Sequence, residues 1–318
     1  MNETQSVYYC FPMQNSSCTK HVRSIAEYFF LYIVIIALSI GSVFLNLVVI
    51  ISISCIKHLQ TQTNLLVLSL AVADLLVGAV VIPVEGYSAV ETCWYFGVQF
   101  CFLFTVMNYT IISSSLGHVL FISVDRFFAV SYPLVYSQKV TAGRTMFCIF
   151  ITWSSSLLYN LLLVYTNMNA TLAKHVNMCH GLCLIEYSHE WDFIDVIISL
   201  ALPCCVMITL NLKILKVATY QAKMISTTTA AFRSENQVAI PKKSETKAVK
   251  SLGTVVTVYM SCWIPYYLSY FLNHTSVFYL AFTWILYSNS FFNPLIYSIF
   301  YSWFKESLKK LFTFKIIT

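Results

Sequence analysis

Long apolar runs separated by short polar connectors make up most of the chain. A membrane-spanning helix needs about 20 predominantly apolar residues. Seven runs meet that length, at about 28–53, 64–89, 98–131, 144–166, 191–218, 247–271 and 278–301. The third and fifth runs carry polar residues at intervals, which indicates that one side of each faces protein rather than lipid. The pattern predicts an all-α membrane protein built as a seven-transmembrane helix bundle.

Two shorter regions flank these runs. Residues 1–27 form a polar segment before the first span, and residues 302–318 follow the seventh. From Trp303 to Phe312, apolar and basic residues alternate at helical spacing, which predicts an amphipathic helix lying on the membrane surface. The expected organisation is therefore an extracellular N-terminus (1–27), a membrane domain (28–301), and an amphipathic helix with a cytoplasmic tail (302–318).

Composition excludes several classes of protein. Of the 318 residues, 58% are hydrophobic and only 10% are charged, whereas soluble domains have about 25% charged residues. A soluble enzyme of this size would expose far more apolar surface than water tolerates. Despite the net charge of +6, the composition also argues against a nucleic-acid binder, and no nucleic-acid partner is expected.

The distribution of basic residues predicts the orientation. With the N-terminus outside, only Lys20, Arg23 and Lys174 are extracellular, and the other sixteen of the nineteen lysines and arginines are on the inner side. This asymmetry follows the positive-inside rule. Glycosylation sequons at Asn2, Asn15 and Asn169, and a further one at Asn273, all fall on the outer side. We expect a multi-pass plasma-membrane protein with an extracellular N-terminus.

Six of the eleven cysteines lie on the oxidising outer side. An even number in that compartment favours three disulfides, although spacing alone leaves fifteen pairings open. The six residues are Cys10, Cys18, Cys93, Cys101, Cys179 and Cys183.

Each span carries a polar residue or short motif, and together these resemble the rhodopsin-like (class A) G-protein-coupled receptors. In chain order they are Asn46, Asp74, Asp125-Arg126-Phe127, Trp153, Pro203, Cys262-Trp263-Ile264-Pro265 and Asn293-Pro294-Leu295-Ile296-Tyr297. Residues 289–304, with the segments 93–97 and 179–183, further resemble the trace amine-associated receptors.

That resemblance implies a non-enzymatic receptor for small amines. It further implies an olfactory role and signalling through a stimulatory G protein and cyclic AMP, with membrane lipids as the surroundings. It also implies three disulfide pairings: Cys101 with Cys183, Cys10 with Cys179, and Cys18 with Cys93.

The ligand-binding acid stands at an unusual position. Aminergic receptors resembling this chain carry an aspartate in the third span, seven residues after the disulfide cysteine, where this sequence has Asn108. The fifth span instead carries Asp195, eight residues before Pro203 and therefore two turns further out. We interpret Asp195 as the counterion of a ligand ammonium, an arrangement that resembles some fish members of the family. The alternative is a hydrated carboxylate facing the outer vestibule.

Aromatic and polar side chains are expected to complete this pocket. Aromatic faces attract cations within about 6 Å. Asn108 and Thr105 are candidates for hydrogen bonds to the other end of the ligand, and Glu85 in the second span is a second candidate acid, for the far ammonium of a diamine, unless it faces water. The candidate rings are Trp263, Tyr266, Tyr267, Trp284 and Tyr287.

Asp74 is expected to lie near the middle of the membrane, where an isolated carboxylate is costly. Oxygen ligands suit a hard cation, so a sodium ion is one interpretation and a protonated structural Asp is the other. Its neighbours, as the resemblance implies, are Asn46, Asn289, Ser290 and Asn293.

The G-protein switch is expected at the inner end of the third span. Arg126 would pair with Asp125 and with Glu245 of the sixth span in the resting state, and Tyr297 belongs to the same switch. Two residues depart from the family pattern: Asn211 replaces a usual tyrosine and Tyr259 a usual phenylalanine.

Three alternatives stay open at this point. A class A receptor for a non-amine ligand would share the fold and leave Asp195 without a ligand. A transporter or channel would show internal repeats with broken helices, which are absent from this sequence. A non-signalling membrane protein would bind ligand without nucleotide exchange.

Overall fold

The computed structural model describes residues 7–175, 179–185, 187–231, 243–272, 277–300, 304–306 and 308–309. Within these ranges, only the backbone is described for 137, 169–175, 222, 225–231, 243–252, 270–272 and 277–279.

Seven helical spans form the molecule, which confirms the predicted fold class. Five of them are long and apolar enough to cross a membrane over described residues alone. The spans are α1 (Ile25–Cys55); α2 (Gln62–Leu76), η2 (Val77–Val81) and α3 (Ile82–Glu91); α4 (Gly97–Ser131); α6 (Ala142–His175); α7 (His189–Asp195), η3 (Val196–Ala201) and α8 (Leu202–Ala231); α9 (Lys243–Leu272); and α10 (Val277–Phe300).

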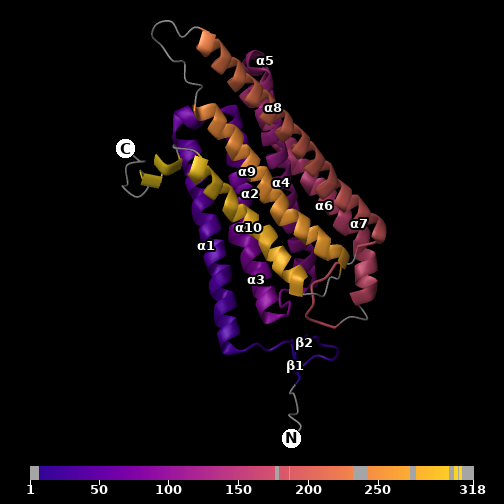
Figure 1. Ribbon diagram of the computed structural model, residues 1–318. Helices are drawn as coiled ribbons and strands as arrows, with labels where there is room; N and C mark the ends of the chain where they lie inside the picture. Colours follow the sequence, from indigo (N-terminus) through magenta and orange to yellow (C-terminus); the bar gives the residue numbers. More distant parts are fainter. Residues whose placement is uncertain are drawn as a thin grey trace.

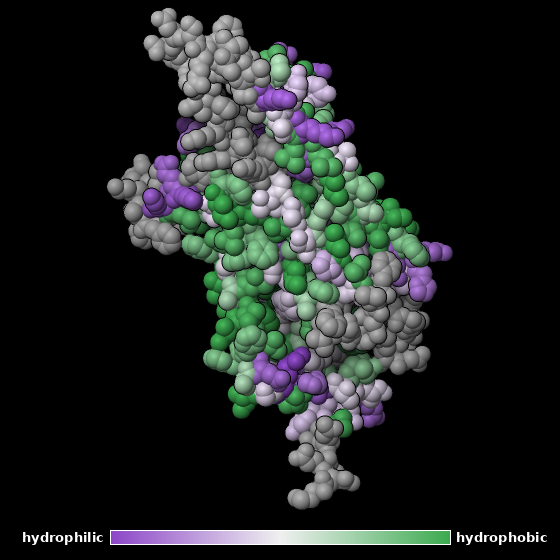
Figure 2. Space-filling view, viewed as in Figure 1, coloured by the Kyte–Doolittle hydropathy of each residue, from purple (hydrophilic) through white to green (hydrophobic). Residues whose placement is uncertain are grey.

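The short elements are β1 (Tyr8–Tyr9), β2 (Thr19–Lys20), η1 (Lys57–Leu59) and α5 (Pro133–Lys139). In the elongated bundle, β1 and β2 lie at the end opposite the C-terminus (Figure 1). Helix α4 packs against α2, α6 and α8. Hydrophobic residues cover the middle of the visible face and hydrophilic residues gather toward both ends (Figure 2), as expected for a protein surrounded by lipid.

Two of the spans contain a π-helix, which the sequence pattern does not predict. In the second span, η2 interrupts the α-helical ladder, and Ser39 Oγ of α1 donates to the carbonyl oxygen of Gly78 at 2.7 Å. A Cβ atom on Gly78 would lie 2.9 Å from Cβ of Ser42, so only glycine allows α1 to approach this closely. In the fifth span, η3 begins directly after Asp195. π-Helices of this kind often occur at functional sites.

The N-terminal segment forms an antiparallel β1–β2 pair cross-linked to the bundle. The expected Cys101–Cys183 disulfide is present. The other two expected pairings are wrong: the disulfides join Cys10 to Cys93 and Cys18 to Cys179.

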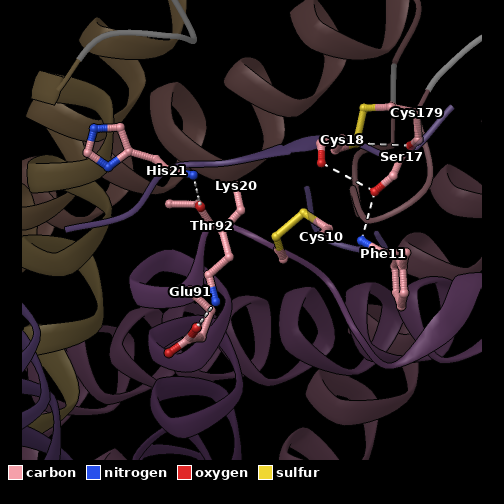
Figure 3. Close-up of a disulfide and its surroundings, with 10 residues drawn as sticks. Cys10, Phe11, Ser17, Cys18, Lys20, His21, Glu91, Thr92 and Cys179 are labelled. Carbon is pink, nitrogen blue, oxygen red and sulfur yellow. Dashed lines mark hydrogen bonds and ion pairs between the residues drawn. A yellow bond between two sulfur atoms is a disulfide. The ribbon is translucent and has the colours of Figure 1, made fainter. Parts of the chain in front are cut away.

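The pairing follows from the backbone. A parallel bridge between Ser17 and His180 places the next residue, Cys18, beside Cys179 with a Cα–Cα distance of 4.7 Å. Cys10, in contrast, lies 5.7 Å (Cα–Cα) from Cys93. The bond from Cys18 to Cys179 is visible in Figure 3.

Polar contacts add to this attachment. Lys20 Nζ forms an ion pair with Glu91 at the end of α3, at 2.5 Å, and the backbone N–H of His21 donates to Thr92 Oγ1 (Figure 3). The hydrogen bond to Glu91 raises the pKa of Lys20. Asn15, one of the predicted glycosylation sites, is exposed between the two strands. Asn2 lies outside the described residues, and for Asn169, within α6, only the backbone is described.

The predicted amphipathic helix is described only in part. Phe304–Glu306 and Leu308–Lys309 are helical, Phe304 is buried, and Lys305 and Glu306 are exposed. The remainder of 302–318 lies outside the described residues.

Candidate ligand pocket and signalling site

Asp195 lies at the junction of α7 and η3, in the half of the bundle that carries β1 and β2 (Figure 1). Its carboxylate points between helices. Oδ1 accepts hydrogen bonds from the Tyr159 hydroxyl of α6 at 3.1 Å and from Ser199 Oγ of η3 at 2.9 Å, while Oδ2 accepts from the Tyr267 hydroxyl of α9 at 2.9 Å. The side chain is half-buried and faces protein rather than lipid.

All three partners of Asp195 are neutral hydroxyl groups. Among the described side chains, no lysine or arginine forms an ion pair with it. A half-buried carboxylate held by these neutral donors is well oriented, yet no described side chain balances its charge. Such a group favours a cation from outside, because opposite charges attract more strongly in a low-dielectric site than in water.

A column of aromatic rings on α9 leads from Asp195 toward the inner half of the bundle. Tyr267 stacks on Trp263 with ring centroids 6.0 Å apart, and Trp263 stacks on Tyr259 at 5.1 Å. All three rings are buried. Pro265 interrupts the same helix, and a proline inside a helix creates a kink. The acid and the kinked helix are therefore in direct contact through Tyr267.

The other predicted pocket rings lie on α9 and α10. Tyr266 packs edge-on against Tyr267 at 5.3 Å, and Trp284 packs edge-on against Tyr287 at 5.8 Å. Thr105, predicted as a ligand contact, donates its hydroxyl to the carbonyl oxygen of Cys101 at 2.9 Å. That bond leaves the Thr105 oxygen able to accept but not to donate a further hydrogen bond.

A second polar group joins three spans. Asn108 of α4 is buried, and its Nδ2 donates to Glu85 Oε1 of α3 and to the Tyr287 hydroxyl of α10, both at 3.2 Å. Glu85 thus points into the bundle and does not simply face water. Asn108 Oδ1 has no hydrogen-bond partner among the described residues.

Asp74 is fully buried at the centre of the bundle. Its Oδ1 accepts from Ser115 Oγ at 3.1 Å and its Oδ2 from Asn293 Nδ2 at 2.8 Å. Asn46 Nδ2 donates to the carbonyl oxygen of Ser290 at 3.0 Å, which ties α1 to α10. The structure brings together all five residues predicted for this cluster.

Asn293, which donates to Asp74, and Asn289, in the same helix, are both buried, and the Oδ1 atom of each has no donor among the described residues. A small cavity borders this region, lined by Val77, Ile112, Ser115, Trp263, Leu286, Tyr287, Asn289 and Ser290. A carboxylate with nearby amide and hydroxyl oxygens fits a hard cation such as sodium.

At the inner end of α4, Asp125 is paired with its neighbour. Arg126 Nη2 lies 2.6 Å from Asp125 Oδ2, and Thr63 Oγ1 of α2 donates to the same oxygen at 2.6 Å. The Tyr136 hydroxyl of α5 donates to Oδ1 at 2.7 Å. Burial raises the pKa of Tyr136, so its hydroxyl keeps the proton that it donates. Tyr297 is buried, and for Glu245 only the backbone is described.

Sequence reasoning missed the partners that hold the acids: Tyr159 and Ser199 on Asp195, Ser115 on Asp74, and Thr63 and Tyr136 on Asp125. One signal was present, since Ser199 follows Asp195 by one helical turn. Ser115 lies on α4, on a different helix from Asp74. The tyrosines and Thr63 come from other helices, and no local pattern identifies them.

The seven spans, the buried Asp74 cluster and the Asp125–Arg126 pair define a seven-transmembrane receptor of the rhodopsin class. Residues 45–297 match the family described as "7 transmembrane receptor (rhodopsin family)". The chain is 37% identical to trace amine-associated receptor 13c of Danio rerio, over 97% of this chain and 93% of that protein. It is 34% identical to trace amine-associated receptor 4 of Mus musculus (96% and 92% covered) and 37% identical to trace amine-associated receptor 6 of Pan troglodytes (98% and 93%).

The chain belongs to the trace amine-associated receptor family of G-protein-coupled receptors. It is therefore a multi-pass membrane receptor and not an enzyme, with a small ligand and a G protein as its partners.

Proposed function

We propose that this receptor binds a small amine from outside the cell through an ion pair between the ligand ammonium and Asp195. The observation that carries the proposal is the set of contacts on Asp195, which consists of three hydroxyl groups and no cation among the described side chains. The ligand ammonium would supply the missing positive charge. Tyr267, with Trp263 and Tyr266 packed on it, would line the pocket beside this ammonium, since rings near a cation stabilise it. Trp284 and Tyr287 of α10 would contact the rest of the ligand.

Binding would reach the G protein through α9. Tyr267 contacts both Asp195 and Trp263, so a cation on the carboxylate changes the hydrogen bond that Tyr267 makes. This biases the equilibrium between two positions of the inner half of α9 beyond Pro265. At the inner end, release of Arg126 from Asp125 would open the surface that the G protein occupies.

We further propose a plasma-membrane location with the N-terminus outside, an olfactory role and coupling to a stimulatory G protein. The location rests on the sixteen-to-three distribution of basic residues and on the three disulfides in the half of the molecule that carries the N-terminus. The olfactory role and the type of G protein rest on the family resemblance alone.

The test of the amine site is the substitution Asp195→Asn, which removes the charge and keeps the shape. Cells expressing either receptor are exposed to a panel of primary amines and to the matching alcohols, and cyclic AMP is measured. The potency of active amines is expected to fall at least about thirtyfold, because loss of one partner of a desolvated charge pair costs about 2–5 kcal/mol. The alcohols should be inactive on both receptors.

Glu190→Gln is the matched control, because Glu190 is an exposed acid on the same helix, α7. Surface staining of the intact cells measures folding and transport for every variant. Undiminished amine responses in Asp195→Asn, at equal surface density, would contradict the counterion role and would favour a receptor for a non-amine ligand. A response without a rise in cyclic AMP would contradict stimulatory coupling.

We also propose that Asp74 holds a sodium ion, with oxygens of Ser115, Asn289 and Asn293 nearby. Replacing sodium chloride by choline chloride at equal ionic strength should change agonist affinity in membranes of the unmodified receptor. Asp74→Asn should remove this difference. If sodium still changes agonist affinity in Asp74→Asn, the ion that causes the effect does not bind at Asp74.

A further inference from the structure

Glu85, on a different span, has the same kind of environment as Asp195. It lies on α3, and its carboxylate contacts the Asn108 amide and the Tyr287 hydroxyl. Both are neutral donors. Among the described side chains, no lysine or arginine forms an ion pair with Glu85. Glu85 belongs to the second span and Asp195 to the fifth, and α4 packs against helices of both spans, α2 and α8.

The contact with Asn108 places the Glu85 carboxylate beside a position where related receptors carry a ligand-binding acid. Position 108 is where resembling aminergic receptors carry their ligand-binding aspartate. Here the amide Nδ2 of that residue lies 3.2 Å from Glu85 Oε1. The negative charge missing from α4 is therefore supplied from α3, within hydrogen-bond distance of the same place.

An unused acceptor accompanies this charge. Asn108 is only 3% exposed, and its Oδ1 atom accepts no hydrogen bond from any described residue. A buried carbonyl oxygen without a donor is unfavourable, because it has lost its contact with water and gained no hydrogen bond in exchange. An ammonium group has three donors to offer, so one bound beside Glu85 could satisfy Asn108 Oδ1 and the carboxylate together.

The backbone presents both acids in the same way. Glu85 lies four residues after the end of the π-helix η2, and Asp195 directly precedes the π-helix η3. Each π-helix adds one residue to a turn and so rotates the outer part of its span relative to the inner part. The two acids thus lie on the rotated outer segments, α3 and α7, at the end of the bundle near β1 and β2 (Figure 1).

We propose that Glu85, Asn108 and Tyr287 form a second ammonium site, and that the preferred ligands are diamines with one ammonium on Asp195 and the other on Glu85. This rests on the proposed role of Asp195. A diamine balances both carboxylates at once, whereas a monoamine leaves one of them without a cation. The carbon chain between the two ammonium groups would lie across the outer half of α4.

The experiment compares two ligand series on one receptor. Straight-chain diamines of increasing length are paired with monoamines in which one terminal ammonium is replaced by a methyl group. On the unmodified receptor, the best diamine is expected to be about ten- to a hundredfold more potent than its paired monoamine, the range for a hydrogen bond to a charged group.

Glu85→Gln should reduce that diamine to the potency of its paired monoamine and leave the monoamine unchanged. Glu85→Asp keeps the charge but withdraws it by one methylene group, so the most potent diamine should become longer by one or two carbons. Glu91→Gln is the control acid on α3, since Glu91 pairs with Lys20 and not with Asn108.

Equal potency of diamines and monoamines on the unmodified receptor would overturn the second site, as would an unchanged diamine preference in Glu85→Gln at normal surface density. The two proposals fail separately. If Asp195→Asn abolishes all amine responses while Glu85→Gln changes none, the second site is wrong and the first stands. If Glu85→Gln abolishes the monoamine response while Asp195→Asn leaves it intact, both assignments are wrong.

Discussion

Asp195 and Asp125 are the same residue type in opposite halves of one bundle, and their surroundings differ in a single respect. Each carboxylate accepts hydrogen bonds from two or more hydroxyl groups on other elements. Asp125 also has Arg126, at 2.6 Å, whereas no described cation pairs with Asp195. Within the described residues, the inner acid, Asp125, therefore has a cationic partner, and the outer acid, Asp195, has none.

This difference separates an internal lock from a ligand site. An acid with its own arginine stabilises the resting state and is released only when the protein changes conformation. An acid with hydroxyl partners alone is oriented in advance and gains most from a cation that arrives. The comparison predicts that a cation added beside Asp195 should block the binding of amines there. It also predicts that a weaker contact between Asp125 and Arg126 should release the resting state.

The largest effect is expected from giving Asp195 a cation of its own. In Tyr159→Lys, the new ammonium replaces a hydroxyl that lies 3.1 Å from Oδ1 and would occupy the carboxylate. Amine potency should fall at least about thirtyfold, since the pair energy of about 2–5 kcal/mol is then used within the protein. Dose–response curves at matched surface density measure this.

Tyr159→Gln separates charge from the loss of the ring, because its side chain is neutral and polar. It should lose much less potency than Tyr159→Lys. Equal losses in the two variants would mean that the ring matters and that the charge balance at Asp195 does not.

The next effect is expected from removing the charge of Asp125. Asp125→Asn weakens the contact with Arg126, a charge-assisted bond that contributes about 1.5–3 kcal/mol to the resting state. Ligand-free signalling should rise about tenfold or more, limited by the fraction of receptor that is still inactive. Basal cyclic AMP per surface receptor is the measurement. Asp195→Asn should leave that basal level unchanged, and a rise there would contradict the division into lock and ligand site.

The smallest effects come from single hydroxyl groups. Thr63→Val removes one donor from Asp125, and Tyr159→Phe removes one from Asp195. Each carboxylate keeps its other donors, so about two- to tenfold changes are expected. Thr63→Val should raise basal signalling without changing amine potency, and Tyr159→Phe should lower amine potency without changing basal signalling. A change of amine potency in Thr63→Val, or of basal signalling in Tyr159→Phe, would show that the two regions do not act separately.

The sequence was informative about the fold because lipid imposes a simple rule. A segment that crosses the bilayer must satisfy its own backbone hydrogen bonds, so each apolar run of sufficient length predicts a helix. The position of Asp195 in the outer half also followed from sequence, because two helical turns separate it from Pro203. The hydroxyl partners of the Asp195 side chain could not be predicted from the sequence, because Tyr159 and Tyr267 come from other spans.

Two features could not be predicted because they depend on contacts between distant segments. The π-helices have no local signature: Gly78 is a single glycine in an apolar run, and its role depends on Ser39 and Ser42 of α1. The pairing of Cys10 and Cys18 depends on the bridge from Ser17 to His180. The six disulfide cysteines were correctly predicted from their place on the outer side, whereas the family resemblance gave the right partner for Cys101 and the wrong partners for Cys10 and Cys18.

The three disulfides have a consequence for motion. Together they join the N-terminal segment, the connection after α3, the start of α4 and the connection before α7. Covalent ties of this kind hold the extracellular ends of several helices at fixed separations. The tied ends of α3, α4 and α7 therefore have less freedom to separate than their cytoplasmic ends, whereas α9, which carries none of the six cysteines and contains Pro265, is not held by these bonds.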